Sequence, residues 1–301
     1  MLYHILVFLS DICCLLPASV ARFIGKILGE LTWIVVPKKR KQMAIHNIER
    51  CLKVSTDKAE QIAKKSWTRF GPMIMEVLRF KVICKNIDKY VTIKGEENIK
   101  KAMSYENGGV IATAHSGNWE IIGAALTHKG MNDAANHSGL VLDALGAEGV
   151  NNFINYCRAF TGMHITDKLD IKEMMKMLGQ KYFIGLIMDQ DGGSTGIIMP
   201  FLGYEASCVQ GPAVMSRFKS APILPAFITE DKKRPGHHIL TVLEPVFTAK
   251  TKDKQKDIYD MMASLTSLVE QHIRDYPEEW FWLHDRWKYV ERKKKQITCS
   301  K

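Results

Sequence analysis

Hydrophobic positions gather in two runs near the start of the chain, and a proline ends each run. The first occupies residues 2–16 and stops at Pro17, and the second occupies residues 23–36 and stops at Pro37. Each run is shorter than the ~20 residues that a helix needs to cross the hydrocarbon of a bilayer. We therefore expect a helical hairpin that enters one leaflet of a membrane, with two ordinary core helices as the alternative.

A basic cluster follows the second run directly and consists of Lys38, Lys39, Arg40 and Lys41. Basic side chains beside an apolar segment favour anionic headgroups on the cytoplasmic face of a membrane. A cleaved signal peptide is not indicated, because the chain begins Met-Leu-Tyr-His without a basic start. The pattern thus predicts residues 1–37 as membrane-anchoring helices, with the bulk of the protein in the cytoplasm.

The rest of the chain alternates between helical and extended patterns. Apolar residues at spacings of three and four predict helices over residues 43–52 and 59–80. Short apolar runs predict strands over residues 91–93, 109–113, 183–188, 223–228 and 239–243. Helices are expected over residues 118–127, 150–160, 171–178, 212–218 and 257–275. We predict an α/β domain over residues 38–290, with a central mixed sheet flanked by helices, and a basic, disordered tail over residues 291–301.

Composition and charge narrow the possible functions. Hydrophobic residues make up 46% and charged residues 25%, which excludes a disordered or low-complexity chain. The mean hydropathy of −0.11 excludes a polytopic membrane protein. A formal net charge of +10 points to an anionic partner such as nucleic acid, anionic lipid or a phosphorylated substrate. No nucleic-acid motif is present, so nucleic acid is not expected. The seven cysteines contain no C-x-x-C pair and indicate neither disulfides nor structural zinc.

The most informative segment covers residues 108–120 and reads GGVIATAHSGNWE. An apolar strand ends in small residues, His115 follows its carboxyl end, and a helix opens near Asn118. Open α/β sheets place their ligands at this edge. Glu120 falls in the first helical turn, where we expect it to accept a hydrogen bond from one imidazole nitrogen. The other nitrogen is then free to act as a general base.

The spacing of this pair is not specific by itself. A chain with ten histidines is expected to contain roughly one H-x4-[DE] by chance, and this one has a second at His128 and Asp133, which we assign to the surface. The alternatives for the first are a structural His115 and an ordinary first-turn Glu120.

Cys157 is expected to be a buried helix cysteine, with a thiol nucleophile as its alternative. A metal hydrolase would lack a second nearby histidine.

Residues 109–120 resemble the H-x4-[DE] signature of the glycerolipid and lysophospholipid acyltransferases. The wider chain is similar to the late acyltransferases of lipid A biosynthesis, of the lauroyl/myristoyl type. That branch shares, in the same order, a hydrophobic anchor, a basic stretch leading into an Asn-containing helix (residues 40–52), a helix with Glu76, an Asp-rich turn before a Pro-Phe-hydrophobic-Gly strand end (residues 188–203) and an aromatic motif (residues 277–288). The match covers residues 1–290, and the ordered motifs are far more specific than the first one alone.

The resemblance implies a glycerolipid-acyltransferase-like fold and acyl transfer from a thioester, of acyl-carrier protein or CoA, to a hydroxyl of a lipid A precursor. His115 would deprotonate that hydroxyl while Glu120 orients the imidazole. Backbone amides of Ser116, Gly117 and Asn118 are candidates to bind the oxyanion. Neither a metal nor a bound cofactor is implied.

Three further positions are candidates to bind substrate. Arg158 matches an arginine of the family and would hold the oxyanion, a phosphate or the donor's phosphopantetheine, with a surface cation as the alternative. Asp189 ends an apolar run and so lies at a strand's carboxyl edge, where it is expected to have a polar role, with Asp191 as the weaker candidate. A tight turn is the alternative for both. Trp280, Trp282 and Trp287 are expected to pack or to lie at a membrane interface.

The sequence therefore predicts a membrane-associated O-acyltransferase at the cytoplasmic side of the bacterial inner membrane. A related enzyme that acts on another glycolipid or on a lysophospholipid is one alternative. A non-catalytic, basic membrane-binding protein that uses the N-terminal hairpin and the Lys38–Lys41 cluster is the other.

Overall fold

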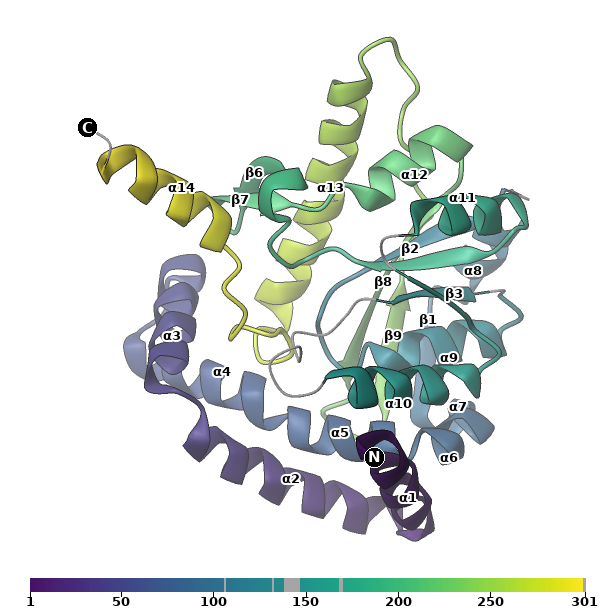
Figure 1. The fold of residues 1–301 in the computed structure, drawn as a ribbon, viewed down its shortest axis with the longest axis vertical. Coiled ribbons are helices and arrows are strands. Elements are labelled where there is room, and N and C mark those ends of the chain that lie inside the picture. The colour runs from purple at the N-terminus through teal and green to yellow at the C-terminus, as the bar shows by residue number, and fades with distance from the viewer. Residues whose placement is uncertain (106, 132, 138–146, 168–169, 300–301) are drawn as a thin grey trace.

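A seven-stranded sheet forms the centre of the computed structural model, which describes residues 1–105, 107–131, 133–137, 147–167 and 170–299 (Figure 1). The strands follow the order β1-β9-β8-β2-β5-β3-β4, and all neighbours are parallel except the antiparallel pair β8 and β9. They are β1 (Val91–Lys94), β2 (Gly109–Thr113), β3 (Asp133–His137), β4 (His164–Asp167), β5 (Phe183–Ile187), β8 (Ile223–Glu230) and β9 (His238–Val242). This mixed sheet confirms the predicted fold class.

Helices cover both faces of the sheet because its central strands are apolar on both sides. Along β2, which is buried throughout, Val110 and Ala112 pack into one core and Ile111 packs into the other. The first core contains α11 (Ile171–Gly179), α12 (Gly211–Lys219) and α13 (Lys254–Asp275), and the second contains α8 (Glu96–Met103), α9 (Glu120–His128) and α10 (Ala147–Ala159). Near-continuous apolar strands are typical of a sheet that is covered in this way.

The register of β2 and β5 determines the position of the site. Thr113 lies opposite Ile187 in this parallel pair, at the last position of both strands. The two carboxyl ends therefore meet at one edge of the sheet, and residues at equal distances beyond them become neighbours.

The first 90 residues of the chain supply a layer of helices at one end of the molecule (Figure 1). It contains α1 (Leu2–Leu15), α2 (Ala18–Val35), α3 (Lys38–Leu52), α4 (Thr56–Thr68), α5 (Phe70–Leu78), α6 (Phe80–Lys85) and α7 (Ile87–Tyr90). Helix α2 packs closely on α5 through glycines: a Cβ at Gly25 would lie 2.7 Å from the Cα atom of Pro72. Small residues allow two helix backbones to approach this closely.

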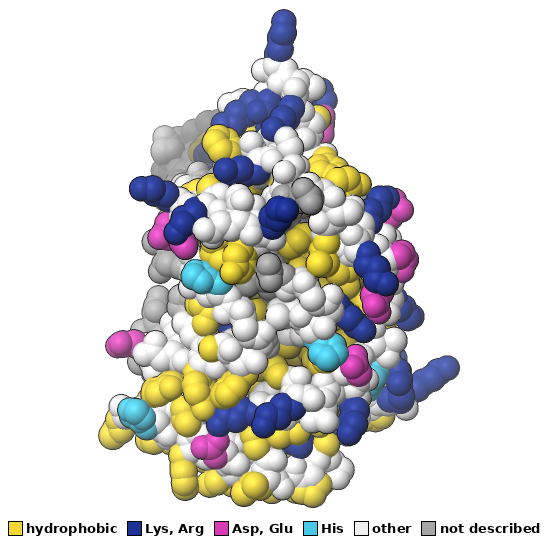
Figure 2. All heavy atoms as spheres, turned by 90° about the vertical axis from the view of Figure 1, so that its right-hand side faces the viewer, with side chains coloured by type: hydrophobic (Ala, Val, Ile, Leu, Met, Phe, Trp, Pro, Cys, Tyr) yellow, Lys and Arg dark blue, Asp and Glu magenta, His cyan; other side chains and the backbone are white. Residues whose placement is uncertain are grey.

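Helices α1 and α2 expose many of their apolar side chains. The exposed fraction is 65% for Phe8, 63% for Phe23 and 72% for Ile34. Figure 2 shows hydrophobic side chains gathered at the lower end of one face, with Lys and Arg side chains next to them. Among the described residues, no helix combines the length and the apolar character that crossing a membrane requires.

Two features differ from the sequence-based expectations. The strands β3 and β4 and the separate antiparallel hairpin of β6 (Ile197–Phe201) and β7 (Tyr204–Cys208) were not among the predicted strands. The predicted disorder of the tail is wrong up to Cys299, because α14 (Lys288–Cys299) is a helix. Its charges are paired as well as solvated: Glu291 binds Arg50 at 3.1 Å and Lys294 binds Glu205 at 2.9 Å.

Candidate active site

His115 and Asp189 form a buried pair at the carboxyl edge of the sheet. Each lies two residues beyond a strand end, His115 after β2 and Asp189 after β5, so the register of the strands brings them together. The imidazole Nδ1 lies 2.8 Å from one carboxylate oxygen, and the backbone amide of His115 donates to the other at 3.0 Å. Because a carboxylate only accepts, Nδ1 is the donor and Nε2 of the neutral ring keeps its lone pair.

The surroundings of Asp189 keep it ionised. Its side chain is buried, and the indole of Trp280 donates to the same oxygen as the His115 amide, at 2.6 Å. Burial alone raises the pKa of this carboxyl group, but the charge and hydrogen bonds of His115 and the bond from Trp280 outweigh burial and lower the pKa to about 2. The carboxylate thus fixes the orientation and the tautomer of the imidazole.

Glu120 does not have the expected partner. Both of its carboxylate oxygens accept hydrogen bonds from Arg158, through Nε and Nη2 at 2.9 Å each, and both side chains are buried. The expected hydrogen bond between Glu120 and His115 is therefore corrected, since Asp189 holds the imidazole. Arg158, in the last turn of α10, meets Glu120 at the start of α9 with a fork of two donors that matches a carboxylate. This geometry also excludes the surface-cation alternative for Arg158.

The turn after His115 offers fewer free amides than expected. The amide of Ser116 donates to the carbonyl of Ala114, and the amide of Gly117 donates to the carbonyl of Glu279. Of the three predicted oxyanion donors, only the Asn118 amide makes no hydrogen bond with the described part of the chain. The conformation of the turn requires glycine at position 117, where φ is +59° and a Cβ would lie 2.8 Å from the carbonyl carbon of Ile228.

The side chains of the same turn are also bonded. Ser116 Oγ lies 2.8 Å from Nε2 of His272, whose pKa burial lowers to about 4, so this ring is neutral at physiological pH. Asn118 Nδ2 donates to Glu76 at 2.8 Å, and Nε2 of His238 lies 3.0 Å from the same oxygen. Burial opposes a charge on His238, but Glu76 outweighs burial and raises the pKa of His238 above its ordinary value. The turn is therefore held from several elements.

Arg69 is a site residue that the sequence did not indicate. Its Nη1 donates to the carbonyl of Gly117 at 2.8 Å, and its guanidinium lies 4.6 Å from the ring centre of Phe70. Two further nitrogens, Nε and Nη2, are buried without a hydrogen-bond partner in the described chain. Burial lowers the pKa of Arg69 to about 10, against the opposing effect of Glu279. Donors remain available beside the turn that carries His115.

The structure gives the remaining candidates partners other than the imidazole of His115. Both carboxylate oxygens of Asp191 accept from backbone amides, of Gly193 at 3.3 Å and Tyr289 at 2.9 Å, as the tight-turn alternative implies. Cys157 is buried, and burial raises the pKa of its thiol to about 12, which does not favour a thiolate nucleophile. The described residues contain no cluster of three His, Cys, Asp or Glu side chains placed to bind a metal.

The aromatic C-terminal segment, residues 277–288, packs against the turn after β2 and against Asp189. Trp280, Trp282 and Trp287 are all buried, which agrees with packing and not with a membrane interface. The amide of Phe281 donates to the His115 carbonyl at 3.2 Å, so this segment pairs along its backbone with the turn that follows β2. Trp119 adds an edge-on contact to the imidazole, with ring centres 4.9 Å apart.

A histidine with Nδ1 held by a carboxylate, at the carboxyl edge of a mixed α/β sheet, is an arrangement suited to proton transfer at Nε2. The sequence places the chain more narrowly. It belongs to the bacterial lipid A biosynthesis acyltransferase family, whose profile matches residues 1–289. The protein is therefore an acyltransferase, and the family supports acyl transfer to a lipid A-type glycolipid.

Individual relatives are distant but cover most of the chain. It is 23% identical over 280 residues to the lipid A biosynthesis lauroyltransferase of Escherichia coli, covering 91% of this chain and 87% of that protein. It is 20% identical over 279 residues to the palmitoleoyltransferase of the same bacterium, covering 91% and 86%. The crystal structure of the 1-acyl-sn-glycerophosphate acyltransferase PlsC from Thermotoga maritima is similar with a TM-score of 0.39 and 15% identity, covering 85% of this chain and 99% of that one.

Proposed function

We propose that this acyltransferase moves a fatty acyl chain from the thioester of an acyl-carrier protein to a hydroxyl of a lipid A precursor, with His115 as the general base. The observation that carries the proposal is the His115–Asp189 pair, which leaves Nε2 of the imidazole available beside an edge where sheets bind ligands. The family and the two Escherichia coli relatives support the acceptor class. The net charge of +10 suits an acidic donor protein and a phosphorylated acceptor.

In this mechanism His115 Nε2 takes the proton of the acceptor hydroxyl as its oxygen attacks the thioester carbonyl carbon. Asp189 stabilises the imidazolium that forms. The tetrahedral intermediate then collapses, the carbon–sulfur bond breaks, and the proton on His115 passes to the leaving thiolate. The products are an ester and a free thiol, so no other reactant is needed.

Two sets of donors are suited to the oxyanion of the intermediate. The Asn118 amide has no partner in the described chain, and Arg69 has two unpartnered nitrogens beside the same turn. Donors that are fixed before the reaction stabilise developing charge without reorganisation. We assign the buried Glu120–Arg158 pair to positioning the start of α9, which follows the catalytic turn.

The N-terminal helices support association with the cytoplasmic face of the inner membrane. Phe8, Phe23 and Ile34 are exposed on α1 and α2, and Lys38, Lys39, Arg40 and Lys41 open α3 directly after them. Apolar side chains beside a basic cluster suit the interface of an anionic leaflet. We keep residues 1–37 as the membrane-binding unit, residues 38–290 as the catalytic domain and residues 291–301 as the basic tail.

The test is transfer of labelled acyl chain from acyl-carrier protein to a tetra-acylated lipid A precursor, with wild-type protein and the H115A variant. We expect transfer by the wild type and a loss of ~100-fold or more in the variant, which is the usual contribution of a general base. A folded H115A protein with near-wild-type turnover would contradict the mechanism. It would mean that another group takes the proton of the acceptor hydroxyl.

A second acceptor class has support of its own. The chain is 20% identical over 219 residues to the phosphatidylinositol mannoside acyltransferase of Mycobacterium tuberculosis, covering 71% of this chain and 64% of that protein. Competition between the lipid A precursor, a phosphatidylinositol mannoside and a lysophospholipid in the same assay separates the acceptor classes. Preference for the lipid A precursor is the expected result.

A further inference from the structure

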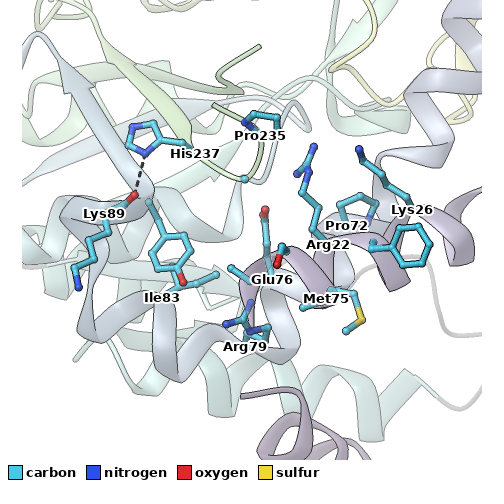
Figure 3. Close-up of a pocket in the computed structure, with 16 residues that line it drawn as sticks. Arg22, Lys26, Pro72, Met75, Glu76, Arg79, Ile83, Lys89, Pro235 and His237 are labelled. Atoms are coloured by element: carbon cyan, nitrogen blue, oxygen red, sulfur yellow. Dashed lines mark hydrogen bonds between the residues drawn. The ribbon is translucent and has the colours of Figure 1, made fainter. Parts of the chain in front are cut away.

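A cavity of about 540 Å³ lies between α2, α5 and the turn that joins β8 to β9, apart from the His115–Asp189 pair (Figure 3). Charged side chains from several elements line it: Arg22 and Lys26 from α2, Glu76 from α5, Arg79 between α5 and α6, and Lys89 from α7. Four of these five are cations. The excess of positive charge indicates an anionic ligand.

Arg79 is the decisive residue of this cavity. Only 7% of its surface is exposed, and its guanidinium makes no hydrogen bond or ion pair with the described part of the chain. Its Nε atom is buried without a partner. A buried cation without a counter-charge is strongly unfavourable, so this position is suited to an anion that comes from outside the chain.

The other charged residues of the cavity do not cancel its excess of positive charge. Arg22 binds Glu230 through Nη2, but its Nε is buried without a partner. Among the residues that line the cavity, Glu76 is the acid, and its Oε2 already accepts from Asn118 and lies 3.0 Å from His238. Glu76 is thus bonded to the site turn and to His238, and the described residues show no ion pair between Glu76 and Arg79.

The position of the cavity connects it both to lipid and to the catalytic turn. Phe23 lines the cavity and is 63% exposed, and it begins a row of exposed apolar residues along α2 that continues with Ile27 and Leu31. On the other side, Glu76 is bonded to Asn118 in the turn that carries His115. An amphiphile whose anionic group occupies the cavity therefore has an apolar surface beside it and the catalytic turn within its reach.

We propose that this cavity binds a phosphate group of the acceptor glycolipid, with Arg79 as its principal ligand and Arg22, Lys26 and Lys89 as supporting cations. The proposal rests on the proposed function, since it assigns part of the same acceptor. A guanidinium binds phosphate oxygens through parallel hydrogen bonds, and this geometry distinguishes a phosphate from an uncharged sugar hydroxyl. The site therefore recognises the acceptor by its charge, separately from the hydroxyl that reacts.

The test is equilibrium binding to full-length protein in detergent, without a donor, so that it needs no turnover. The probes are the tetra-acylated lipid A precursor, the same lipid after enzymatic removal of its phosphates, and inorganic phosphate. For the R79M variant we expect at least a ~10-fold loss of affinity for the phosphorylated lipid and no change for the dephosphorylated lipid. K85Q, which removes an exposed cation on α6 outside the cavity, is the matched control and is expected to bind as the wild type does.

Several outcomes would overturn the assignment. These are an R79M protein that binds both lipids as the wild type does, a wild type that does not distinguish them, and inorganic phosphate that binds as tightly as the lipid. R79M is expected to melt no lower than the wild type, because it removes a buried, unpaired charge. R79K keeps the positive charge but lacks the parallel N–H donors of the guanidinium, so it is expected to bind the phosphorylated lipid with intermediate affinity. This variant keeps the test decisive if R79M does not fold. A wild type that binds the lipid but transfers no acyl chain would refute the proposed function alone.

Discussion

The carboxyl edge of the sheet and the outer face of α1 and α2 are organised in opposite ways. At the sheet edge, His115 is paired with Asp189, Glu120 is paired with Arg158, and all four side chains are buried. On α1 and α2 the apolar side chains are exposed, and Lys26 on α2 makes no ion pair with the described residues. The polar groups at the sheet edge are thus bonded to one another, whereas the apolar side chains and Lys26 on α1 and α2 are exposed and can contact a partner.

This difference shows which property each region contributes. Paired, buried charges hold reacting groups at fixed positions before substrate arrives. Exposed apolar side chains are costly in water unless something covers them, and large exposed apolar patches mark surfaces of interaction. An exposed cation beside them, such as Lys26, can attract an anionic partner. We therefore expect substitutions in the first region to change turnover or folding, and substitutions in the second to change binding.

The largest effect is expected at Asp189. D189N replaces the carboxylate by an amide, so the imidazole loses the group that fixes its tautomer and stabilises its charge. Turnover should fall by roughly 1,000-fold, or about 4 kcal/mol of transition-state free energy. Single-turnover acyl transfer measures this, with D170N on the exposed cap of α11 as a control. A D189N enzyme within tenfold of the wild type would mean that Asp189 does not orient the base.

The next effect is expected on folding. E120A removes the carboxylate that accepts hydrogen bonds from Nε and Nη2 of the buried Arg158 guanidinium, and loss of one member of a buried ion pair costs about 3 kcal/mol or more in unfolding free energy. Denaturant unfolding measures this loss. The double variant E120A/R158M removes both charges and should recover a large part of the stability. If the double variant is no more stable than E120A, the loss of stability in E120A does not come from the buried charge of Arg158.

A smaller effect is expected on membrane binding. F8S removes an exposed aromatic side chain from α1, and lipid burial of such a side chain contributes ~1.5 kcal/mol or more. Binding to vesicles that contain anionic lipid should weaken roughly tenfold. F218S provides the matched control, because Phe218 on α12 is exposed to a similar degree, 71% against 65%, away from α1 and α2. Equal losses in the two variants would contradict a specific membrane face.

The smallest effect is expected from His238. Glu76 raises the pKa of His238, so the protonated imidazole stabilises the folded state below the unfolded pKa of ~6.5. This contribution is lost as the pH rises through the higher, folded pKa. Unfolding free energies measured between pH 6 and pH 9 should therefore decline less with pH in H238N than in the wild type. Parallel pH profiles would show that the pair with Glu76 contributes no linkage.

The sequence predicts most of the sheet but not all of it. Strands β1, β2, β5, β8 and β9 are where the apolar runs predict them, because these runs are buried. Strand β3 reads Asp-Ala-Ala-Asn-His and β4 reads His-Ile-Thr-Asp, so neither has the apolar pattern of a strand. These two strands form because β3 pairs with both β4 and β5, and this pairing is not visible in their own sequences.

The position of His115 at the edge of the sheet was predictable, but the partners of its imidazole were not. His115 follows an apolar strand, which is a local signal, and Asp189 was predicted at a strand's carboxyl edge for the same reason. Which of them meet depends on β2 and β5 being neighbours, and the order of strands in a sheet is not contained in either segment. The close spacing of Glu120 to His115 therefore favoured the wrong partner. Trp280 and Arg69 reach the site from distant segments and carry no local signal.

The separation of these partners along the chain has a consequence for biosynthesis. Asp189 is 74 positions after His115, and Trp280 is another 91 positions later. At 5–20 residues per second, roughly 10 to 30 seconds of translation separate the first member of the site from the last. Helices α1 and α2 are made before all three. Under the proposed function, a ribosome-bound chain therefore reaches the lipid surface while the His115–Asp189–Trp280 cluster is still incomplete, and acyl transfer begins only after the enzyme is in place.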